Sequence, residues 1–445
     1  MIRPWHLTLA CLLAPAAVLA DDWPQWLGPQ RDGVWRETGI LERFPEGGPT
    51  VRWRTPIGSG YAGPAVANGR VVVMDRRLRQ GTANPENAFD RGSIPGTERV
   101  LCLRESDGAV LWTHEYDCAY TVSYAAGPRC TPLVDGNRVF TLGAEGHLLC
   151  LDIEGGKVIW AKDFKADYGA KTPTWGFAGH PLLDGNRLIC LVGGEGGVAV
   201  AFDKDSGAEV WRALTAKEPG YAPPTMIEHA GRRELIIWHP ESVNALEPET
   251  GRLRWSVPFE SRAGLSVSTP RLSGDRLFIT TFYNGSLLLR LTPGAPEVLW
   301  RSKKASEKDT TELHSIIPTP FIEDGHIYGV CSYGQLRCLQ LATGERVWET
   351  LAATTPEQPT RWANAFLIKH ANRFFLFNER GELIIARLSP RGYEEISRAR
   401  LLEPTNRDPG RLVLWSHPAF ANRSVYARND RELVCVSLAA PELAP

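Results

Sequence analysis

The sequence predicts an all-β protein built by repetition of one four-stranded antiparallel unit. Short β-prone runs alternate with Asp-Gly and Gly-rich turns, which is the pattern of an antiparallel meander. Residues 131–160 form one such unit, TPLVDGNRVFTLGAEGHLLCLDIEGGKVIW. This unit is too short to bury a core of its own, so copies must stack. The 42 glycines, 33 prolines and 15 tryptophans of the 445-residue chain suit a turn-rich fold with a repeated aromatic residue.

The closing segment of this unit recurs in register along the chain. Each copy has a small residue, an acidic turn, a glycine and then a tryptophan. Copies end at Trp112, Trp160, Trp211, Trp255 and Trp348, and a looser copy ends at Trp300. The spacing of roughly 45–50 residues is the period of four-stranded propeller blades.

The two ends of the chain together supply one further unit. Residues 50–55, which include Trp53, form a last strand without the three strands before it. Residues 416–420, 424–427 and 432–438 form three strands without a fourth. Pairing them closes the ring and removes the exposed sheet edge. We therefore expect an eight-bladed β-propeller of four-stranded antiparallel blades, closed by pairing the N- and C-terminal strands.

The repeats resemble the pyrroloquinoline-quinone-type (PQQ-like) β-propeller family, whose pattern is small-x-Asp-x-x-Thr-Gly-x-x-x-Trp. Residues 201–211, AFDKDSGAEVW, follow it closely, and segments such as WANAFLI and FNERGELIIARLSP are similar to exported bacterial members. The family includes the propeller subunit of the outer-membrane barrel-assembly machine. The resemblance implies a fold and no catalytic residue. It also implies that one tryptophan per blade docks against the next blade: Trp53, Trp112, Trp160, Trp211, Trp255, Trp300 and Trp348.

The chain divides into three parts. Residues 1–20 have a positive start, an apolar run and the small-residue site Val18-Leu19-Ala20, which predicts a cleaved secretory signal and an exported protein. A membrane anchor, or a lipid on Cys11, is the alternative. Residues 21–49 are rich in Pro, Gly and Trp, which indicates an ordered non-sheet wrap lying on the propeller, or else an aromatic ligand platform. Residues 50–440 form a single propeller domain.

The composition restricts the partners. The net charge is −1 and no basic stripe is present, so nucleic acid is not expected. After residue 20 no apolar run is long enough to cross a membrane, and we expect a monomeric ring. Because export permits oxidation, Cys118 and Cys130, which flank the link between the first two blades, are a candidate disulfide.

Signals for catalysis are weak. The chain has no Gly-x-Ser-x-Gly, no His-Glu-x-x-His, no phosphate-binding loop and no Cys-x-x-Cys pairs. Quinoprotein dehydrogenases with this repeat bind PQQ and Ca²⁺ over the ring axis, and many carry an adjacent Cys-Cys pair against the quinone. This sequence has no adjacent cysteines. We therefore expect neither PQQ nor Ca²⁺.

A proline, or Ala365 in its place, marks where the innermost strand of each blade begins. Because strand side chains alternate faces, the positions one and three before it share a side, which we expect to face the mouth of the central channel. Together with Trp175 and His314, just outside this register, they give the candidate ligand-binding residues: Tyr61, Arg129, Trp175, His180, Tyr221, His314, Trp362, Asn364, Trp415 and His417.

Aromatic walls with a few polar groups are typical of a binding pocket, and Arg129 could hold a carboxylate or a phosphate. Simple filling of a narrow axis is the alternative. A metal site on His180 and His417 lacks an acidic third ligand in the sequence, so no metal is expected. The sequence thus favours a non-catalytic exported scaffold that binds a protein or small ligand at this funnel. A PQQ- and Ca²⁺-dependent oxidoreductase and a carbohydrate-binding propeller are the alternatives.

Overall fold

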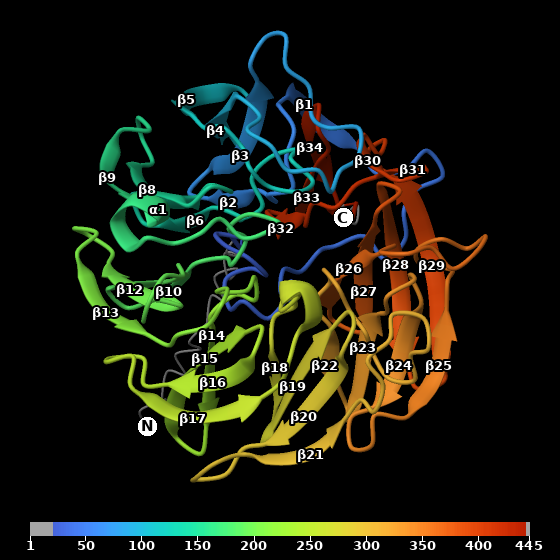
Figure 1. Cartoon of the computed structure of the whole chain (residues 1–445). Coiled ribbons are helices and arrows are strands. Elements are labelled where there is room, and N and C mark those ends of the chain that lie inside the picture. The colour runs from blue at the N-terminus through green and yellow to red at the C-terminus, as the bar shows by residue number, and fades with distance from the viewer. Residues whose placement is uncertain (1–20, 442–445) are drawn as a thin grey trace, which may run out of the picture.

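A computed structural model describes residues 21–441 of the chain, so the expected signal segment lies outside the described residues. Eight four-stranded antiparallel sheets stand as blades around a central axis (Figure 1). This confirms the predicted all-β propeller. Among the described residues, no helix combines the length and the apolarity that crossing a bilayer demands.

The strands follow the chain order from the axis outward. The first three blades contain β2 (Ala65–Ala67), β3 (Arg70–Leu78), β4 (Gly96–Arg104) and β5 (Val110–Asp117); β6 (Leu133–Asp135), β7 (Arg138–Leu142), β8 (His147–Asp152) and β9 (Val158–Asp163); and β10 (Leu182–Asp184), β11 (Arg187–Leu191), β12 (Ala199–Asp203) and β13 (Glu209–Ala213). The next two contain β14 (Thr225–His229), β15 (Arg232–His239), β16 (Ser242–Leu246) and β17 (Leu253–Pro258); and β18 (Arg271–Ser273), β19 (Arg276–Thr281), β20 (Gly285–Arg290) and β21 (Glu297–Arg301).

The last three blades complete the ring. They contain β22 (Phe321–Glu323), β23 (His326–Val330), β24 (Leu336–Gln340) and β25 (Arg346–Thr350); β26 (Ala365–His370), β27 (Arg373–Asn378), β28 (Glu382–Ser389) and β29 (Gly392–Arg400); and β32 (Ala419–Ala421), β33 (Ser424–Arg428), β34 (Glu432–Ser437) and β1 (Val51–Pro56). Outside the blades lie a short helix α1 (Phe164–Tyr168), the 3-10 turn Arg262–Gly264 and a hairpin of β30 (Asn406–Asp408) and β31 (Arg411–Val413).

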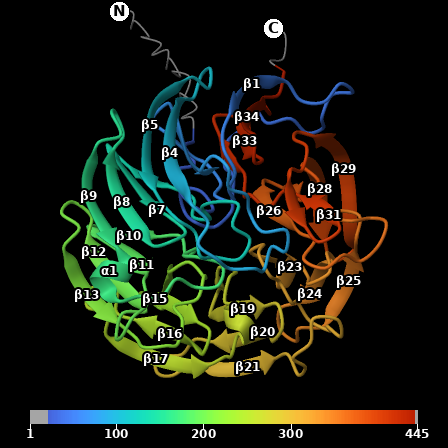
Figure 2. The same ribbon diagram turned by 45° about the horizontal axis from the view of Figure 1, so that its top comes forward.

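Burial follows the position of a strand within its blade. The innermost strand β2 is fully buried, whereas the outermost strand β5 alternates between exposed and half-buried residues. Figure 2 shows the outermost strands, from β5 round to β29, forming the outer wall of the ring. Each innermost strand begins directly after the proline that the sequence pattern marks, and in the seventh blade it begins at Ala365 itself.

The eighth blade joins the two ends of the chain. β1 pairs antiparallel with β34, and Trp53 lies opposite Cys435. The sheet order is β1-β34-β33-β32, as the terminal strands predict. Because β1 completes the eighth blade with backbone hydrogen bonds, the outer edge of β34 is not left unpaired.

The repeated tryptophans connect each blade to the next one. The indole Nε1 of Trp53 donates to the carbonyl of Glu105 at 2.8 Å, and Trp112 donates to the carbonyl of Ile153 at the same distance. The glycine of the next repeat allows this approach, because a Cβ on Gly108 would come within 2.5 Å of the Trp53 ring. Four further tryptophans donate to a carbonyl of the following blade: Trp160, Trp211, Trp300 and Trp348.

Trp255 departs from this hydrogen-bond pattern. It is buried and packs with Leu289 and Leu291 of the next blade, but its Nε1 donates to the carboxylate of Glu234 in its own blade at 3.3 Å. The next repeat reads TPGAPEVLW instead of the usual acidic turn, so the carbonyl partner of the other blades is missing.

Residues 21–49 lie across the propeller without joining a sheet. Trp23 forms an isolated bridge with Val66 in the first blade, Val34 with Lys369 in the seventh and Ile40 with Ala439 near the C-terminus. Arg31 donates from Nη1 to the carbonyl of Pro181 at 2.9 Å. The segment therefore contacts blades on both sides of the axis, and its tryptophans Trp23 and Trp35 are almost completely buried.

The two polar insertions contain more structure than their composition predicts. β3 and β4 extend into the first one with Arg76 opposite Glu98, so only residues 79–95 form a loop. The second, after residue 403, contains the β30–β31 hairpin. Both insertions contribute to the central site described below.

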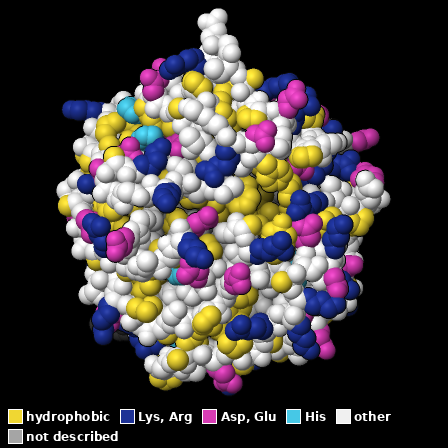
Figure 3. Space-filling model, in the orientation of Figure 1, with side chains coloured by type: hydrophobic (Ala, Val, Ile, Leu, Met, Phe, Trp, Pro, Cys, Tyr) yellow, Lys and Arg dark blue, Asp and Glu magenta, His cyan; other side chains and the backbone are white. Residues whose placement is uncertain are grey.

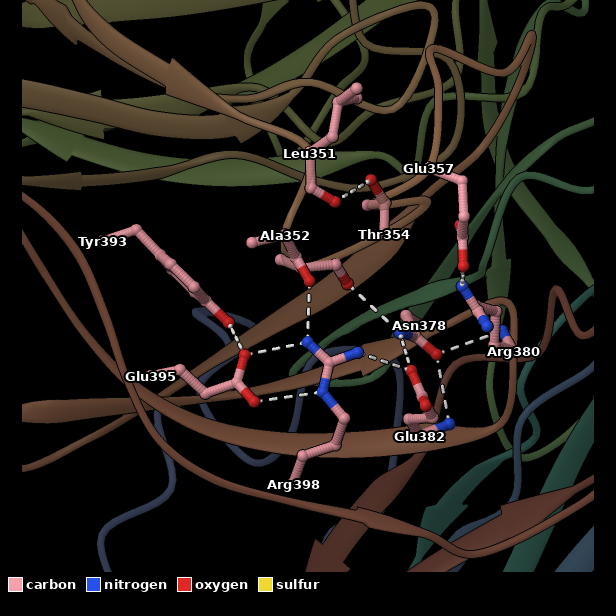
Figure 4. Close-up of polar contacts among 11 residues, drawn as sticks. Leu351, Ala352, Thr354, Glu357, Asn378, Arg380, Glu382, Tyr393, Glu395 and Arg398 are labelled. Carbon is pink, nitrogen blue, oxygen red and sulfur yellow. Dashed lines mark hydrogen bonds and ion pairs between the residues drawn. The ribbon is translucent and has the colours of Figure 1, made fainter.

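Polar side chains fasten the loop after β25 to the seventh blade (Figure 4). Arg398 donates to the carbonyl of Ala352 at 2.7 Å, to Glu382 at 2.7 Å and to Glu395 at 2.8 Å. Asn378 donates to Glu382 at 2.8 Å. This network holds the sixth and seventh blades together on the side away from the axis.

The predicted Cys118–Cys130 disulfide is not formed, and both thiols are free. Cys118 belongs to a cluster with Ile94, Tyr120 and Val122, whereas Cys130 packs with Phe140 and Phe177 in the core of the second blade. The prediction was wrong because two cysteines that lie close in the sequence can still pack into different clusters, as Cys118 and Cys130 do.

Candidate functional site

A cavity of about 470 Å³ opens at the centre of the ring. The position three before each marked proline contributes to its wall in all eight blades: Tyr61, Arg129, Ala178, Tyr221, Val267, Ile317, Trp362 and Trp415. Trp175, His180 and His417 line it as well. The space-filling view of this face shows hydrophobic side chains gathered around a hollow near the centre (Figure 3). The strand register thus brings seven of the ten predicted residues together, and Trp175, just outside the register, joins them.

Trp26 of the N-terminal segment closes one end of the cavity. Its ring stacks on His180 with centroids 3.9 Å apart and planes 9° apart, and it lies 4.6 Å from the ring of His417. The indole Nε1 donates to Thr269 Oγ1 at 3.1 Å. Residues 21–49 therefore act both as a wrap and as part of the aromatic lining.

The two histidines at this end are neutral for structural reasons. Burial lowers the pKa of His417 to about 4. Burial, with Arg31 and His417 nearby, also holds the pKa of His180 well below its usual value. The backbone N–H of Thr131 donates to His180 Nδ1 at 3.0 Å, and protonation of this nitrogen would break that bond.

Acidification is expected to destabilise the protein through these histidines. Both have a folded-state pKa below the unfolded value near 6.5, so the stabilisation is complete above about pH 6.5 and decreases as the pH falls toward about 4. His417→Gln should make the urea midpoint less dependent on pH over this range. His326→Gln, at the partly exposed start of β23 in the sixth blade, is the matched control. An unchanged pH profile in His417→Gln would contradict this account.

An aromatic cluster forms the opposite end of the cavity. Phe89, from the loop 79–95, lies 5.2 Å from Tyr124 and 5.7 Å from Trp362, and Tyr124 lies 5.8 Å from Trp415 between ring centroids. Tyr124 is anchored by its hydroxyl, which donates to Asp408 of the β30–β31 hairpin at 2.9 Å. Phe89 is 41% exposed, so it presents an aromatic ring at the mouth.

Three residues of the lining have a left-handed backbone conformation. Tyr124 has φ 53°, Trp362 has φ 64° and Ala263 has φ 60°, and all three line the cavity. Residues other than glycine adopt this left-handed region at a cost, and such strain tends to occur at ligand sites.

The two arginines of the wall are already engaged. Arg129 donates to the carbonyls of Gly127, of Ser123 at 2.9 Å and of Tyr124 at 2.8 Å. Arg361 lies 4.2 Å above the ring of Trp362 and donates to Glu307 at 2.6 Å. Arg129 thus holds the 123–128 loop in place, which leaves little of its guanidinium for a ligand carboxylate or phosphate.

Two predicted residues do not line the cavity. His314 is buried between strands, with its Nδ1 3.1 Å from the carbonyl of Phe282. Asn364 is fully buried and donates to the carbonyl of Trp362 at 3.3 Å. Side chains one before the proline point toward the neighbouring blades, as the Thr319 to Thr269 hydrogen bond at 3.2 Å shows, and only the long imidazoles of His180 and His417 reach the cavity.

Among the large side chains of the lining that sequence reasoning missed are Trp26, Phe89, Tyr124, Tyr283 and Arg361. They come from loops or from the N-terminal segment, where no repeat fixes the direction of a side chain. Two signals were usable: Phe89 is the only aromatic residue between Arg76 and Arg99, and the Trp-rich segment 21–49 offered an aromatic ligand platform as the alternative to a wrap.

Residues 96–350 and 239–443 match the protein family described as "Outer membrane protein assembly factor BamB". The chain belongs to this family. Proteins of that name are 25% identical over 227 residues in Moranella endobia and 26% identical over 242 residues in Burkholderia pseudomallei. These alignments cover 49% and 52% of this chain, and 56% and 58% of those relatives. The chain thus spans little more than half the length of the curated relatives it matches.

Solved structures show the same fold. BamB from Moraxella catarrhalis superposes with a TM-score of 0.56 at 16% identity, covering 88% of this chain and 99% of that one. The quinohemoprotein alcohol dehydrogenase from Comamonas testosteroni gives a TM-score of 0.61 at 14% identity, with 95% and 81% covered. Because both identities are low, these similarities establish the propeller and no activity.

The lining of the cavity does not fit a quinone held by Ca²⁺. Ca²⁺ takes six to eight oxygen ligands, with carboxylates prominent among them. Among the described residues that line the cavity there is no Asp or Glu, and its two arginines are engaged as described. The donor set therefore matches neither the metal nor the carboxylates of PQQ.

Proposed function

We propose that this BamB-family protein is a non-catalytic scaffold of the cell envelope that binds an apolar segment of a partner protein in the central cavity. The observation that carries the proposal is the wall itself, to which every blade contributes one side chain, mostly aromatic or aliphatic. A pocket that is largely apolar with a few fixed polar groups is typical of binding sites.

The size of the cavity limits what it can accept. A volume of about 470 Å³ is in the range of small-ligand pockets and holds a few large side chains, not a folded domain. A partner would therefore insert a loop or a chain end, while the surrounding face of the ring contacts the rest of it. Phe89 and Trp362 at the mouth are rigid aromatic groups of the kind that dominate binding energy in interfaces.

The relatives support an assembly role over catalysis. They are named as outer membrane protein assembly factors, and a partner from the same machinery is the natural candidate for this chain. A rigid ring with variable loops on one face is suited to holding other proteins.

Trp362→Ala is expected to reduce binding at the cavity at least about tenfold with little loss of stability, because a half-buried aromatic anchor contributes about 2 kcal/mol or more to binding. Anilinonaphthalene sulfonate fluorescence reports directly on the apolar cavity. Pull-down from the native envelope, followed by mass identification, reports on protein partners. Trp362 is a better target than Trp415, whose Nε1 donates to the buried Glu379 at 3.0 Å and whose loss would unfold part of the wall.

Leu412→Ala is the matched control, because Leu412 is 49% exposed beside the cavity but does not line it. Dye and partner binding unchanged in a folded Trp362→Ala protein would contradict the proposal. A bound-quinone spectrum with dye reduction after adding PQQ and Ca²⁺ would favour the oxidoreductase, and retention on a glycan panel would favour carbohydrate binding.

A further inference from the structure

We propose a transition-metal site, with Zn²⁺ as the first candidate, on Glu98, Cys118 and His147 at the junction of the first two blades. Among the described residues, these form the one group of His, Cys, Asp and Glu side chains whose ligand atoms all lie within 4.8 Å of one another. A thiolate, an imidazole and a carboxylate are the three ligand types that Zn²⁺ prefers, and three protein ligands leave one position for water. The site is separate from the central cavity and does not depend on its function.

Strand register places the three ligands. Glu98 on β4 lies opposite Tyr116 on β5, and the Cys118 N–H donates to the carbonyl of Gly96 at 2.8 Å, which continues the same ladder. Residues 116 and 118 therefore point to the same side. His147 begins β8 of the second blade, and its Nδ1 lies 3.9 Å from the Cys118 sulfur. A tetrahedral ion between these two atoms fits that separation.

Hydrogen bonds fix the Glu98 carboxylate and leave one acceptor position for an ion. It is fully buried, and Tyr116 donates to Oε2 at 2.5 Å while the backbone N–H of Ala144 donates to Oε1 at 2.9 Å. Tyr120 also donates to Oε1. A carboxylate has about four acceptor positions, so one position on Oε2 stays free. A Cβ on residue 143 would lie 2.1 Å from Oε2, so only glycine leaves this space.

A carboxylate also lies beside the second ring nitrogen of His147. Asp163 lies directly opposite His147 in the β8–β9 ladder, and its Oδ2 is 3.8 Å from His147 Nε2. The other oxygen, Oδ1, caps helix α1 by accepting from the N–H of Lys165 at 2.9 Å. Metal-binding histidines commonly have their second ring nitrogen on a carboxylate, which fixes the tautomer with the first nitrogen free for the ion.

Access and charge are compatible with binding. Cys118 is 3% exposed, but the His147 side chain is 27% exposed, so an ion can enter from the solvent at the histidine. Burial raises the pKa of the Cys118 thiol, so without metal the sulfur carries its proton. Binding breaks the S–H bond, forms the S–metal bond and releases one proton to solvent.

Titration of the purified full chain with Zn²⁺ against a chromophoric chelator tests the site. We expect one Zn²⁺ per chain, release of one proton, a higher Tm and, with Co²⁺ instead, a thiolate-to-metal absorption band. Asp163→Asn should weaken binding about 10–100-fold while preserving the helix cap, because Asn caps as well as Asp. Cys118→Ser and His147→Gln should weaken it further.

Cys338→Ser on β24 and His326→Gln at the start of β23, both in the sixth blade and outside the proposed site, are the controls and should bind as the wild type does. Absence of saturable binding at one Zn²⁺ per chain would overturn the proposal, as would wild-type affinity in a folded Cys118→Ser protein. If Cys118→Ser fails to fold, His147→Gln, at a partly exposed position, decides the question alone.

Discussion

Replacing Trp53 by Ala is expected to lower the free energy of unfolding by about 3–5 kcal/mol, which is the usual cost of truncating a buried tryptophan. The indole is 7% exposed, donates to the carbonyl of Glu105 and fills the space above Gly108. Thr55 on the same strand donates to the carbonyl of Gly108 at 2.7 Å. Trp53 thus joins β1, the strand that closes the ring, to the first blade. Its loss weakens the contact of β1 with the first blade and, with it, the pairing of β1 with β34.

Urea unfolding followed by tryptophan fluorescence and by circular dichroism measures this effect. Val51→Ala on the same strand is the matched control, because Val51 is 43% exposed and should change stability by less than about 0.5 kcal/mol. Equal stability of the two variants would show that β1 contributes little to closure.

Replacing Asp75 by Asn is expected to cost about 3–5 kcal/mol, because it leaves a buried guanidinium without its counter-ion. Asp75 is fully buried and accepts from Arg99 Nε at 2.8 Å and from the N–H of Gly58 at 2.5 Å. The Arg99 side chain is 6% exposed. This pair links β3, β4 and the segment that follows β1.

The matched control is an exposed ion pair of the same type. Asp107→Asn removes the partner of Arg104, and both side chains of that pair are about half exposed. Such pairs contribute about 0–1 kcal/mol, so the control should be nearly neutral. A loss of similar size in the two variants would contradict the importance given to the buried pair.

The sequence was sufficient for those parts of the molecule that repeat. Period-two alternation and a proline at each strand start placed Tyr61 and Val267 at the axis although they lie more than two hundred residues apart. The terminal strand with Trp53 could be paired with the last three strands because each was incomplete alone.

Contributions from outside the repeat could not be predicted in the same way. Trp26 and Phe89 reach the cavity from a segment and a loop whose backbone follows no period, so their direction depends on tertiary packing. His314 does not line the cavity because it lies outside the strand register, in the irregular stretch before β22, where its ring turns toward the carbonyl of Phe282. The Glu98–Cys118–His147 group was missed because its members come from two blades, and the sequence does not show how neighbouring blades are oriented relative to each other.

The pairing of β1 with β34 has a consequence for how the molecule is made. β1 can find its hydrogen-bonding partner only when residues 432–437 are present. Until then the backbone hydrogen-bonding groups of β1 have no partner strand, and the N-terminal segment lacks its bridge to Ala439. A partly folded chain is therefore vulnerable to mispairing at β1 until the last blade forms, and a shielding chaperone would have its greatest benefit at this strand.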